Sequence, residues 1–328
     1  MEKDSRIFVA GHNGLVGSAI FRKLRAGGYR SLIFRNHSEL DLARQADVEN
    51  FFFSEKPEYV FLAAAKVGGI WANNSYPAEF IYSNLAVQTH VIHAAWENNV
   101  KRLVFLGSSC IYPKECPQPM KEDHLLTGKL EPTNEPYAIA KIAGVKICQS
   151  YNRQYNTKYL AVMPTNLYGP NDNFDPETSH VLPALIRKFH EAKVCNRPVG
   201  IWGTGNPRRE FLHVDDLADA VIFLMNMKEN IFNPIVCPPR APLINIGYGK
   251  DISIRELAEL IKEIVKFDGP IFFEPGHPDG MLKKLLDSSE MGKLGWKPKI
   301  TLPAGIKNMY EWCLKQEIFS FPTPSCKS

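Results

Sequence analysis

The sequence predicts an α/β protein with a doubly wound parallel sheet, followed by a smaller C-terminal α/β lobe that closes over a substrate. Largely apolar runs recur along the first half of the chain, at 6–10, 59–65 and 102–109. Segments with helical periodicity separate them, and a glycine-rich turn follows the first run. Apolar strands that alternate with helices indicate a parallel sheet that is covered on both faces.

The expected elements follow one another in a regular order. We expect strands at 6–10, 31–35, 59–65, 102–109 and 159–169, and helices at 18–27, 47–54, 77–98 and 137–152. A proline-rich polar loop separates the last two of these helices from each other, at 112–136. From residue 171 onwards we expect the lobe, with an amphipathic helix at 252–265 and a return of 211–247 to the first domain.

Composition and charge exclude several classes of protein. The 328 residues carry a formal net charge of +4 and no run of basic residues, which argues against a nucleic-acid partner. Seven cysteines occur without a CxxC spacing, so we expect neither a disulfide framework nor a metal site. No signal-peptide pattern and no apolar run near 18 residues is present, so we expect a cytoplasmic protein that does not bind membranes.

A glycine turn directly follows the first strand and opens a helix. Its sequence is Gly11-His12-Asn13-Gly14-Leu15-Val16-Gly17, a GxxGxxG spacing. Glycines at such positions permit a tight turn and a close approach of the backbone to a pyrophosphate. The helix N-terminus supplies unpaired N–H groups for the phosphates. The sequence therefore predicts a dinucleotide-binding Rossmann domain over residues 1–170.

The end of the second strand bears on which dinucleotide binds. An acidic side chain there would favour NAD, and a basic one would accommodate the 2′-phosphate of NADP. The chain has Arg35, Asn36 and His37, with no carboxylate before Glu39. NADP is therefore the expected cofactor, although Arg35 at an exposed strand end has a purely structural alternative.

Tyr137 and Lys141 are four residues apart and share one face of a predicted helix. A nearby ammonium stabilises a phenolate, so we expect Lys141 to lower the pKa of Tyr137. Tyr137 would then donate a proton to a carbonyl oxygen while a hydride reaches its carbon. Ser108 or Ser109, at the end of the fourth strand, would hold that oxygen.

These motifs resemble the extended short-chain dehydrogenase/reductase family, and within it the GDP-L-fucose synthases. The resemblance covers nearly the whole chain and is densest at 62–74, 105–114, 131–144, 163–174 and 209–216. It implies an NADPH-dependent enzyme that epimerises C3 and C5 of GDP-4-keto-6-deoxy-D-mannose. The same enzyme would then reduce C4 to give GDP-L-fucose.

The resemblance also implies roles for particular residues. Ser108, Tyr137 and Lys141 would act in reduction, and Cys110 and His180 would be the acid/base pair of epimerisation, in either assignment. The implied substrate contacts are Asn166, Lys188, Trp202, Arg209 and Asp279. The implied cofactor contacts are residues 11–17 together with Arg35, His37, Asp41, Leu42, Leu106, Gly107, Ser108, Lys141, Pro164, Asn166, Leu167 and His180. A homodimer through helices 77–98 and 137–152 is also implied.

Other interpretations stay open at this point. The family also contains nucleotide-sugar 4-epimerases and 4,6-dehydratases, and a non-enzymatic NADP sensor would share the domain. Dehydratases usually have an Asp-Glu pair where this chain has Ser109-Cys110. Cys110 alone is explained equally well as a small buried side chain, and Lys188 and Arg209 as solvated charges. Asn13 departs from the basic residue that is common in this glycine turn, which weakens the expected preference for NADP.

Overall fold

A six-stranded sheet forms the larger part of the molecule. The structure is a computed structural model that describes residues 1–276, 279 and 281–319. The strands lie in the order β2-β1-β3-β4-β5-β9, and every neighbouring pair is parallel. Their bounds are β1 Ile7–Ala10, β2 Leu32–Ile33, β3 Tyr59–Leu62, β4 Arg102–Leu106, β5 Tyr159–Pro164 and β9 Leu243–Ile246. The predicted parallel α/β fold is confirmed.

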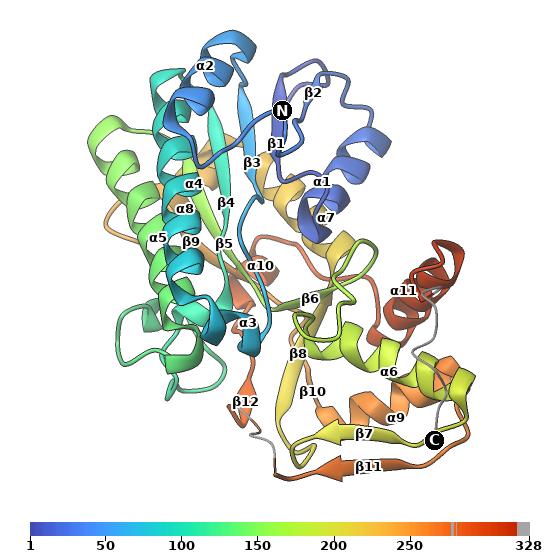
Figure 1. The fold of residues 1–328 in the computed structure, drawn as a ribbon. Helices are drawn as coiled ribbons and strands as arrows, with labels where there is room; N and C mark the ends of the chain where they lie inside the picture. Colours follow the sequence, from blue (N-terminus) through green and yellow to red (C-terminus); the bar gives the residue numbers. More distant parts are fainter. Residues whose placement is uncertain (277–278, 280, 320–328) are drawn as a thin grey trace.

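Helices cover both faces of this sheet (Figure 1). On one face lie α2 (Gln45–Glu55), α4 (Pro77–Glu97) and α5 (Glu135–Tyr155), with the short α3 (Ile70–Ser75) before α4. On the other face lie α1 (Leu15–Ala26), α7 (Val214–Met225) and α8 (Glu229–Val236). Phe8 and Ala10 of β1 face the first set, while Ile7 and Val9 face the second. Burial on both faces explains why this strand is apolar at every position. Among the described residues, no helix is long and apolar enough to cross a membrane.

The strand order places a crevice at the carboxyl end of β1. Strand β2 lies on one side of β1 and β3 on the other, so the direction of winding reverses between them. In open α/β sheets, ligands bind outside the carboxyl ends of the strands at this kind of reversal. The glycine turn leaves β1 at this edge, and Ser108 follows β4 at the same edge.

The lobe has two small sheets around its own apolar core (Figure 1). One sheet contains β6 (Asn166–Tyr168), β8 (Arg208–His213), β10 (Asp251–Ser253) and β12 (Lys283–Lys284), with β8 in contact with the other three. The second pairs β7 (Val199–Trp202) with β11 (Ile271–Glu274). Helices α6 (Val181–Cys195), α9 (Ile254–Val265) and α11 (Leu302–Lys315) complete the core. The remaining short helices are η1 (Ser109–Ile111), η2 (Glu122–His124), η3 (Pro132–Asn134) and α10 (Ser289–Lys293).

The strand predicted at 159–169 is divided between two sheets. Strand β5 ends at Pro164, and β6 pairs instead with β8 of the lobe. Two hydrogen bonds to the carbonyl oxygen of Glu210 hold the chain where it passes from one sheet to the other. The Thr165 hydroxyl donates one (3.1 Å) and the Asn166 side-chain amide the other (2.8 Å). The apolar run alone did not reveal this change of sheet.

The amphipathic helix predicted at 252–265 begins two residues later. Helix α9 starts at Ile254 because Ser253 caps it, with its Oγ accepting the Glu256 N–H at 3.1 Å. Glu256 in turn accepts the Ser253 N–H at 2.8 Å, which completes a capping box. Ile252 and Ser253, which the prediction placed in the helix, belong to β10.

Segments from the second half of the chain pack on the large sheet. Helices α7 and α8 and strand β9 lie there, as do Leu286, Met291 and Trp296. The 286–296 segment had no such assignment from the sequence. The division into a domain at 1–170 and a lobe at 171–328 stays a prediction.

Candidate active site

The glycine turn leaves no space for side chains where the chain doubles back. Gly11 has a φ of +82°, and a Cβ on Gly17 would lie 2.0 Å from the carbonyl oxygen of Gly11. Helix α1 begins at Leu15 with Gly14 at its N-cap, and no side chain caps it. The first N–H groups of α1 therefore point into the crevice beside β1, where they suit a phosphate. The residues fit a dinucleotide.

The end of β2 combines basic and acidic groups. Arg35 forms an ion pair with Glu55 of α2, and its Nη1 donates to the carbonyl oxygen of Phe34 at 2.8 Å. Asn13 donates to the Asn36 side chain at 2.7 Å, which joins the glycine turn to this strand end. The Glu39 carboxylate accepts the N–H of Asn36 at 2.6 Å. The arginine assigned to the 2′-phosphate thus has a carboxylate partner in this structure.

The remaining predicted cofactor residues lie in three places: after β2, at the end of β4, and where the chain leaves β5. His37 is exposed and lies 3.8 Å from Asp41, while Leu42 packs at the margin of the core. Leu106 ends β4 and Gly107 follows it, where a Cβ would collide with the Met163 side chain. Pro164 and Leu167 lie where the chain leaves the large sheet for the lobe.

Ser108, Tyr137 and Lys141 lie together at the carboxyl end of β4. Tyr137 and Lys141 both belong to α5, and the Ser108 side chain lies near enough to the Tyr137 hydroxyl to act on the pKa of the phenol. Lys141 is 3% exposed, and its Nζ donates to the carbonyl oxygen of Leu106 at 2.8 Å. That Nζ lies 5.7 Å from the centre of the Tyr137 ring. The arrangement places a phenol, a hydroxyl and an ammonium around one point.

The expectation that Lys141 lowers the pKa of Tyr137 is wrong for this structure. Burial raises the pKa of the Tyr137 phenol, and the neighbouring Cys110 adds to this, while the hydrogen bond from Ser108 opposes it. Burial also lowers the pKa of Lys141 to about 8. Both groups have lost water, and that loss is the largest cause of each shift. At neutral pH the site therefore holds a neutral phenol, which is a proton donor, beside a charged ammonium.

Cys110 and His180 belong to different elements, η1 after β4 and the start of α6. Cys110 is in η1 and is buried, and its N–H donates to the Ser108 Oγ at 3.4 Å. Burial raises the pKa of its thiol. His180 is the N-cap of α6 and keeps an exposed surface, but the protein around its ring lowers its pKa. At neutral pH the two are a thiol and an uncharged imidazole.

Sequence reasoning missed Lys284, whose charge acts on both of these groups. It opposes the rise in the pKa of Cys110 and adds to the fall in the pKa of His180. Strand β12, which carries it, pairs with β8 so that Lys284 lies opposite Arg209. Two adjacent lysines in the otherwise apolar segment 281–286 were the available signal, because strand alternation sends one of them inward.

The predicted substrate residues gather around β7 and β8 of the lobe. Lys188 of α6 lies over the Trp202 ring, 5.3 Å from its centre, and donates to the Gly200 carbonyl oxygen at 3.1 Å. Asp279 accepts from the N–H and the hydroxyl of Thr204, each at 2.7 Å. Arg209 lies close enough to Asp279 for their charges to interact, and burial lowers the pKa of both Lys188 and Arg209. The Asn166 amide donates to the Glu210 carbonyl oxygen instead.

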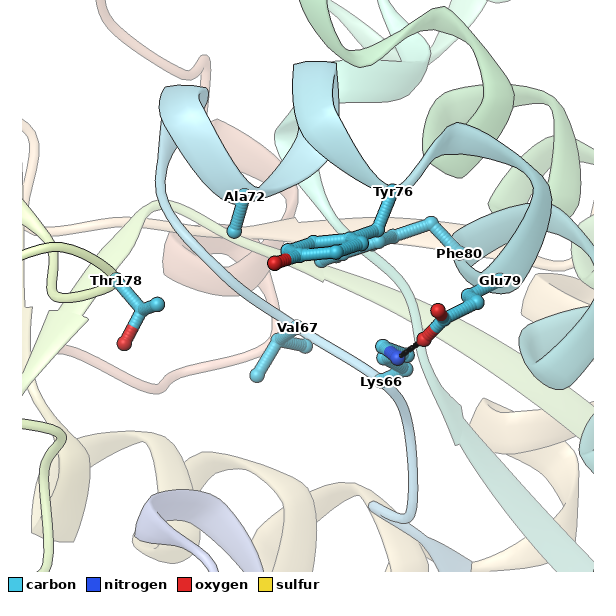
Figure 2. Close-up of a pocket in the computed structure, with 7 residues that line it drawn as sticks. All are labelled: Lys66, Val67, Ala72, Tyr76, Glu79, Phe80 and Thr178. Atoms are coloured by element: carbon cyan, nitrogen blue, oxygen red, sulfur yellow. Dashed lines mark hydrogen bonds and ion pairs between the residues drawn. The ribbon is translucent and has the colours of Figure 1, made fainter.

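A cavity of about 310 Å³ lies next to the phenol. It is lined by Lys66, Val67, Ala72, Tyr76, Glu79, Phe80 and Thr178 (Figure 2). The Phe80 ring meets that of Tyr137 edge to face at 6.1 Å between centres. Figure 2 shows the ion pair of Lys66 with Glu79 at one side of this cavity and Thr178, two residues before His180, at the other.

Comparison with known proteins gives the family. The model of the NAD dependent epimerase/dehydratase family matches residues 7–239. The chain belongs to this family. GDP-L-fucose synthase 1 of Arabidopsis thaliana is 59% identical over 315 residues, which are 96% of this chain and 94% of that protein. GDP-L-fucose synthase of Escherichia coli strain K12 is 53% identical over 313 residues, 95% of this chain and 97% of that protein. The resemblance to GDP-L-fucose synthases is confirmed.

A solved structure supports the same fold and a nicotinamide dinucleotide. MlghC, a GDP-mannoheptose C4 reductase from Campylobacter jejuni with NADP bound, matches with a TM-score of 0.87 at 44% identity. The match covers 95% of this chain and 99% of that one. NAD or NADP is therefore the cofactor of this protein.

Proposed function

We propose that this protein converts GDP-4-keto-6-deoxy-D-mannose to GDP-L-fucose, by epimerisation at C3 and C5 followed by reduction of the C4 ketone with NADPH. One observation carries the proposal. Ser108 accepts the N–H of Cys110 and lies near enough to Tyr137 to act on the pKa of its phenol, so a reductase phenol and a second acid/base group lie beside one serine. The proteins named GDP-L-fucose synthase that are 53–59% identical to this chain support the substrate.

In reduction, the protein's task is to protonate the ketone oxygen. Tyr137 is protonated at neutral pH and donates that proton, while Ser108 orients the oxygen. The bound cofactor supplies the hydride to C4. Lys141 is charged below about pH 8, and its ammonium stabilises the phenolate that remains. The ammonium therefore matters most after the proton has left Tyr137.

In epimerisation, the C4 ketone makes the protons at C3 and C5 acidic. One of Cys110 and His180 removes a proton, the electron pair of the broken C–H bond moves to the ketone oxygen, and the other group returns a proton on the opposite face. At neutral pH the uncharged imidazole of His180 can accept a proton and the thiol of Cys110 can return one, whereas the opposite assignment requires Cys110 to lose its proton first. Their placement in different elements, η1 and the start of α6, suits opposite faces of one ring.

The lobe holds the nucleotide end of the substrate. Lys188 and Arg209 supply positive charge for the diphosphate, the exposed Trp202 supplies a flat apolar face, and Asp279 supplies acceptor oxygens. When the nucleotide is bound to these residues of the lobe, the sugar would lie at the junction between the lobe and the large sheet. That is where Cys110, His180 and Tyr137 lie.

NADP is the proposed form of the cofactor. The NADP-bound neighbour supports it, and Arg35 and His37 lie at the end of β2 where a 2′-phosphate would bind. The ion pair of Arg35 with Glu55 and the nearness of Glu39 reduce the positive charge on offer there. We therefore expect a smaller preference for NADPH over NADH than a free arginine would give.

Product identification tests the proposal. The protein is incubated with GDP-4-keto-6-deoxy-D-mannose and either NADPH or NADH, and the product is identified by NMR. GDP-L-fucose is the expected product. A GDP-6-deoxy sugar without inversion at C3 and C5 would instead support a C4 reductase, which the similarity to the GDP-mannoheptose C4 reductase favours as second candidate. No turnover of reduced cofactor would contradict both and favour a sensor.

We also infer a homodimer and a cytoplasmic location. Helices α4 and α5 pack side by side and present Tyr82 (70% exposed), Ile139 and Tyr155 to solvent. A second copy of this face would cover these apolar groups, because a two-fold axis brings the same surface patch of both copies together. Light scattering of the protein and of its Tyr82→Lys variant tests the dimer, which the charge should weaken.

A further inference from the structure

Lys284 lies where the lobe meets the acid/base pair. It is the second residue of β12, which pairs with β8 so that Lys283 is opposite Arg208 and Lys284 opposite Arg209. Arg209 is one of the residues assigned to the diphosphate. The strand therefore brings Lys284 next to the nucleotide site on one side.

The segment around Lys284 is also fixed to the loop that follows Cys110. The N–H of Leu285 donates to the Gln118 side chain at 2.9 Å, and the N–H of Met120 donates to the Leu285 carbonyl oxygen at 2.8 Å. The buried Glu210 accepts the N–H of Leu286 at 3.0 Å. With hydrogen bonds on both sides, the backbone at Lys284 has little freedom.

The two lysines of β12 have opposite surroundings. Lys283 forms an ion pair with Asp251 at 3.0 Å on the outer side of the sheet. Lys284 has no carboxylate within ion-pair distance among residues 1–276, 279 and 281–319, and the charged or titratable groups that face it are Cys110, Arg209 and His180. Lys284 is half-buried and lies beside a second cation, Arg209, and both features disfavour its charged form. Burial is the larger cause of the fall in the pKa of Lys284, and Arg209 adds to it. A structural lysine would be paired as Lys283 is.

We propose that Lys284 is a positioning residue of epimerisation, whose ammonium favours the deprotonated forms of both Cys110 and His180. The group that removes the proton from carbon must be deprotonated, so the cation favours that step in either assignment, while the other group keeps the proton that it returns. The other groups that face Cys110 are Ser108, Tyr137 and Lys141. The inference rests on the proposed epimerase activity.

The test measures proton exchange separately from reduction. GDP-4-keto-6-deoxy-D-mannose at saturating concentration is incubated in D₂O with the protein and oxidised NADP, and deuterium at C3 and C5 is followed by NMR from pH 5.5 to 9. For Lys284→Met we expect the acidic limb of the exchange profile to move up by about one pH unit, with exchange about tenfold slower on that limb. Lys284→Arg should restore most of the rate. Lys283→Met, on the same strand, should match the unchanged protein.

The outcomes separate the possible failures. If Lys284→Met raises only the KM for the sugar nucleotide and leaves the pH profile in place, the lysine is a nucleotide anchor and the inference is wrong. If the unchanged protein exchanges no deuterium, the epimerase assignment fails, and this inference fails with it. Lys284→Gln, measured in parallel, gives the same readout if the methionine variant does not fold.

Discussion

Replacing Lys141 by Met should make the protein more stable at neutral pH while abolishing reduction. Lys141 is 3% exposed, and its ammonium, which has lost its water, donates a hydrogen bond to the carbonyl oxygen of Leu106. Its pKa falls from an unfolded value of 10.5 to about 8 in the folded chain. A group whose charged form is disfavoured by folding lowers stability wherever it is charged in both states.

The size of the effect follows from these two values. A difference of 2.5 pKa units, 10.5 minus 8, corresponds to about 3 kcal/mol of destabilisation below pH 8. The methionine variant also loses the hydrogen bond to Leu106, which cancels about 1.5 kcal/mol of its gain in stability. The methionine variant should therefore be about 1–2 kcal/mol more stable at pH 7. As pH rises from 8 to 10.5, the folded lysine loses its proton before the unfolded one, so the unchanged protein regains stability and the advantage of the variant disappears near pH 9.5.

Urea unfolding at pH 7 and pH 9.5 measures this directly. The matched control is Lys146→Met on the same helix, where the side chain is half-exposed and bonds Gln149 at 3.1 Å, so little change is expected at either pH. The reasoning is refuted if Lys141→Met is less stable than the unchanged protein at pH 7, or if the difference is the same at both pH values. Loss of hydride transfer in the same variant would show that the buried charge is kept for chemistry at a cost in stability.

Four further changes test the remaining assignments. Tyr137→Phe should slow hydride transfer by about 10²–10⁴-fold while deuterium still enters C3 and C5; loss of both would argue against a role limited to reduction. Cys110→Ser should slow the entry of deuterium at C3 and C5 more than it slows hydride transfer, and full deuterium exchange in this variant would show that Cys110 has no role in epimerisation. Gly17→Ala adds a Cβ 2.0 Å from the Gly11 carbonyl oxygen, so fluorescence titration should show NADPH binding lost. Arg35→Ala should raise the KM for NADPH about tenfold and leave that for NADH unchanged; equal changes would mean that Arg35 acts only through Glu55.

Sequence patterns were sufficient for the large sheet because its strands are buried on both faces. Nearly every position of β1, β3 and β5 faces one of two cores, so the apolar runs were unbroken and each strand begins within one residue of its predicted start. The glycine turn was equally readable, since only glycine fits where Gly17 approaches Gly11. The patterns failed where strands are short and change sheets, as at Pro164 and at β12, because two or three residues carry no usable periodicity.

The candidate site was predicted by residue type but not by protonation state. The spacing of Tyr137 and Lys141 correctly placed both on one face of α5, yet the direction of the shift in the pKa of Tyr137 came out opposite to expectation. A sequence shows which charges are near each other along a helix. It does not show how much water the fold removes, and here that loss decides the sign.

The same loss of water connects binding of the nucleotide to proton transfer. Burial pushes Tyr137, Cys110, His180 and Lys141 toward their neutral forms. Arg209 repels Lys284 across the β8–β12 pair and so lowers the pKa of Lys284. A diphosphate bound to Arg209 would cancel that repulsion, so Lys284 would hold its proton more firmly and favour deprotonated Cys110 more strongly. On this reasoning the epimerisation groups become fully active only when the nucleotide is in place, and a keto sugar without its diphosphate should exchange deuterium slowly even at saturating concentration.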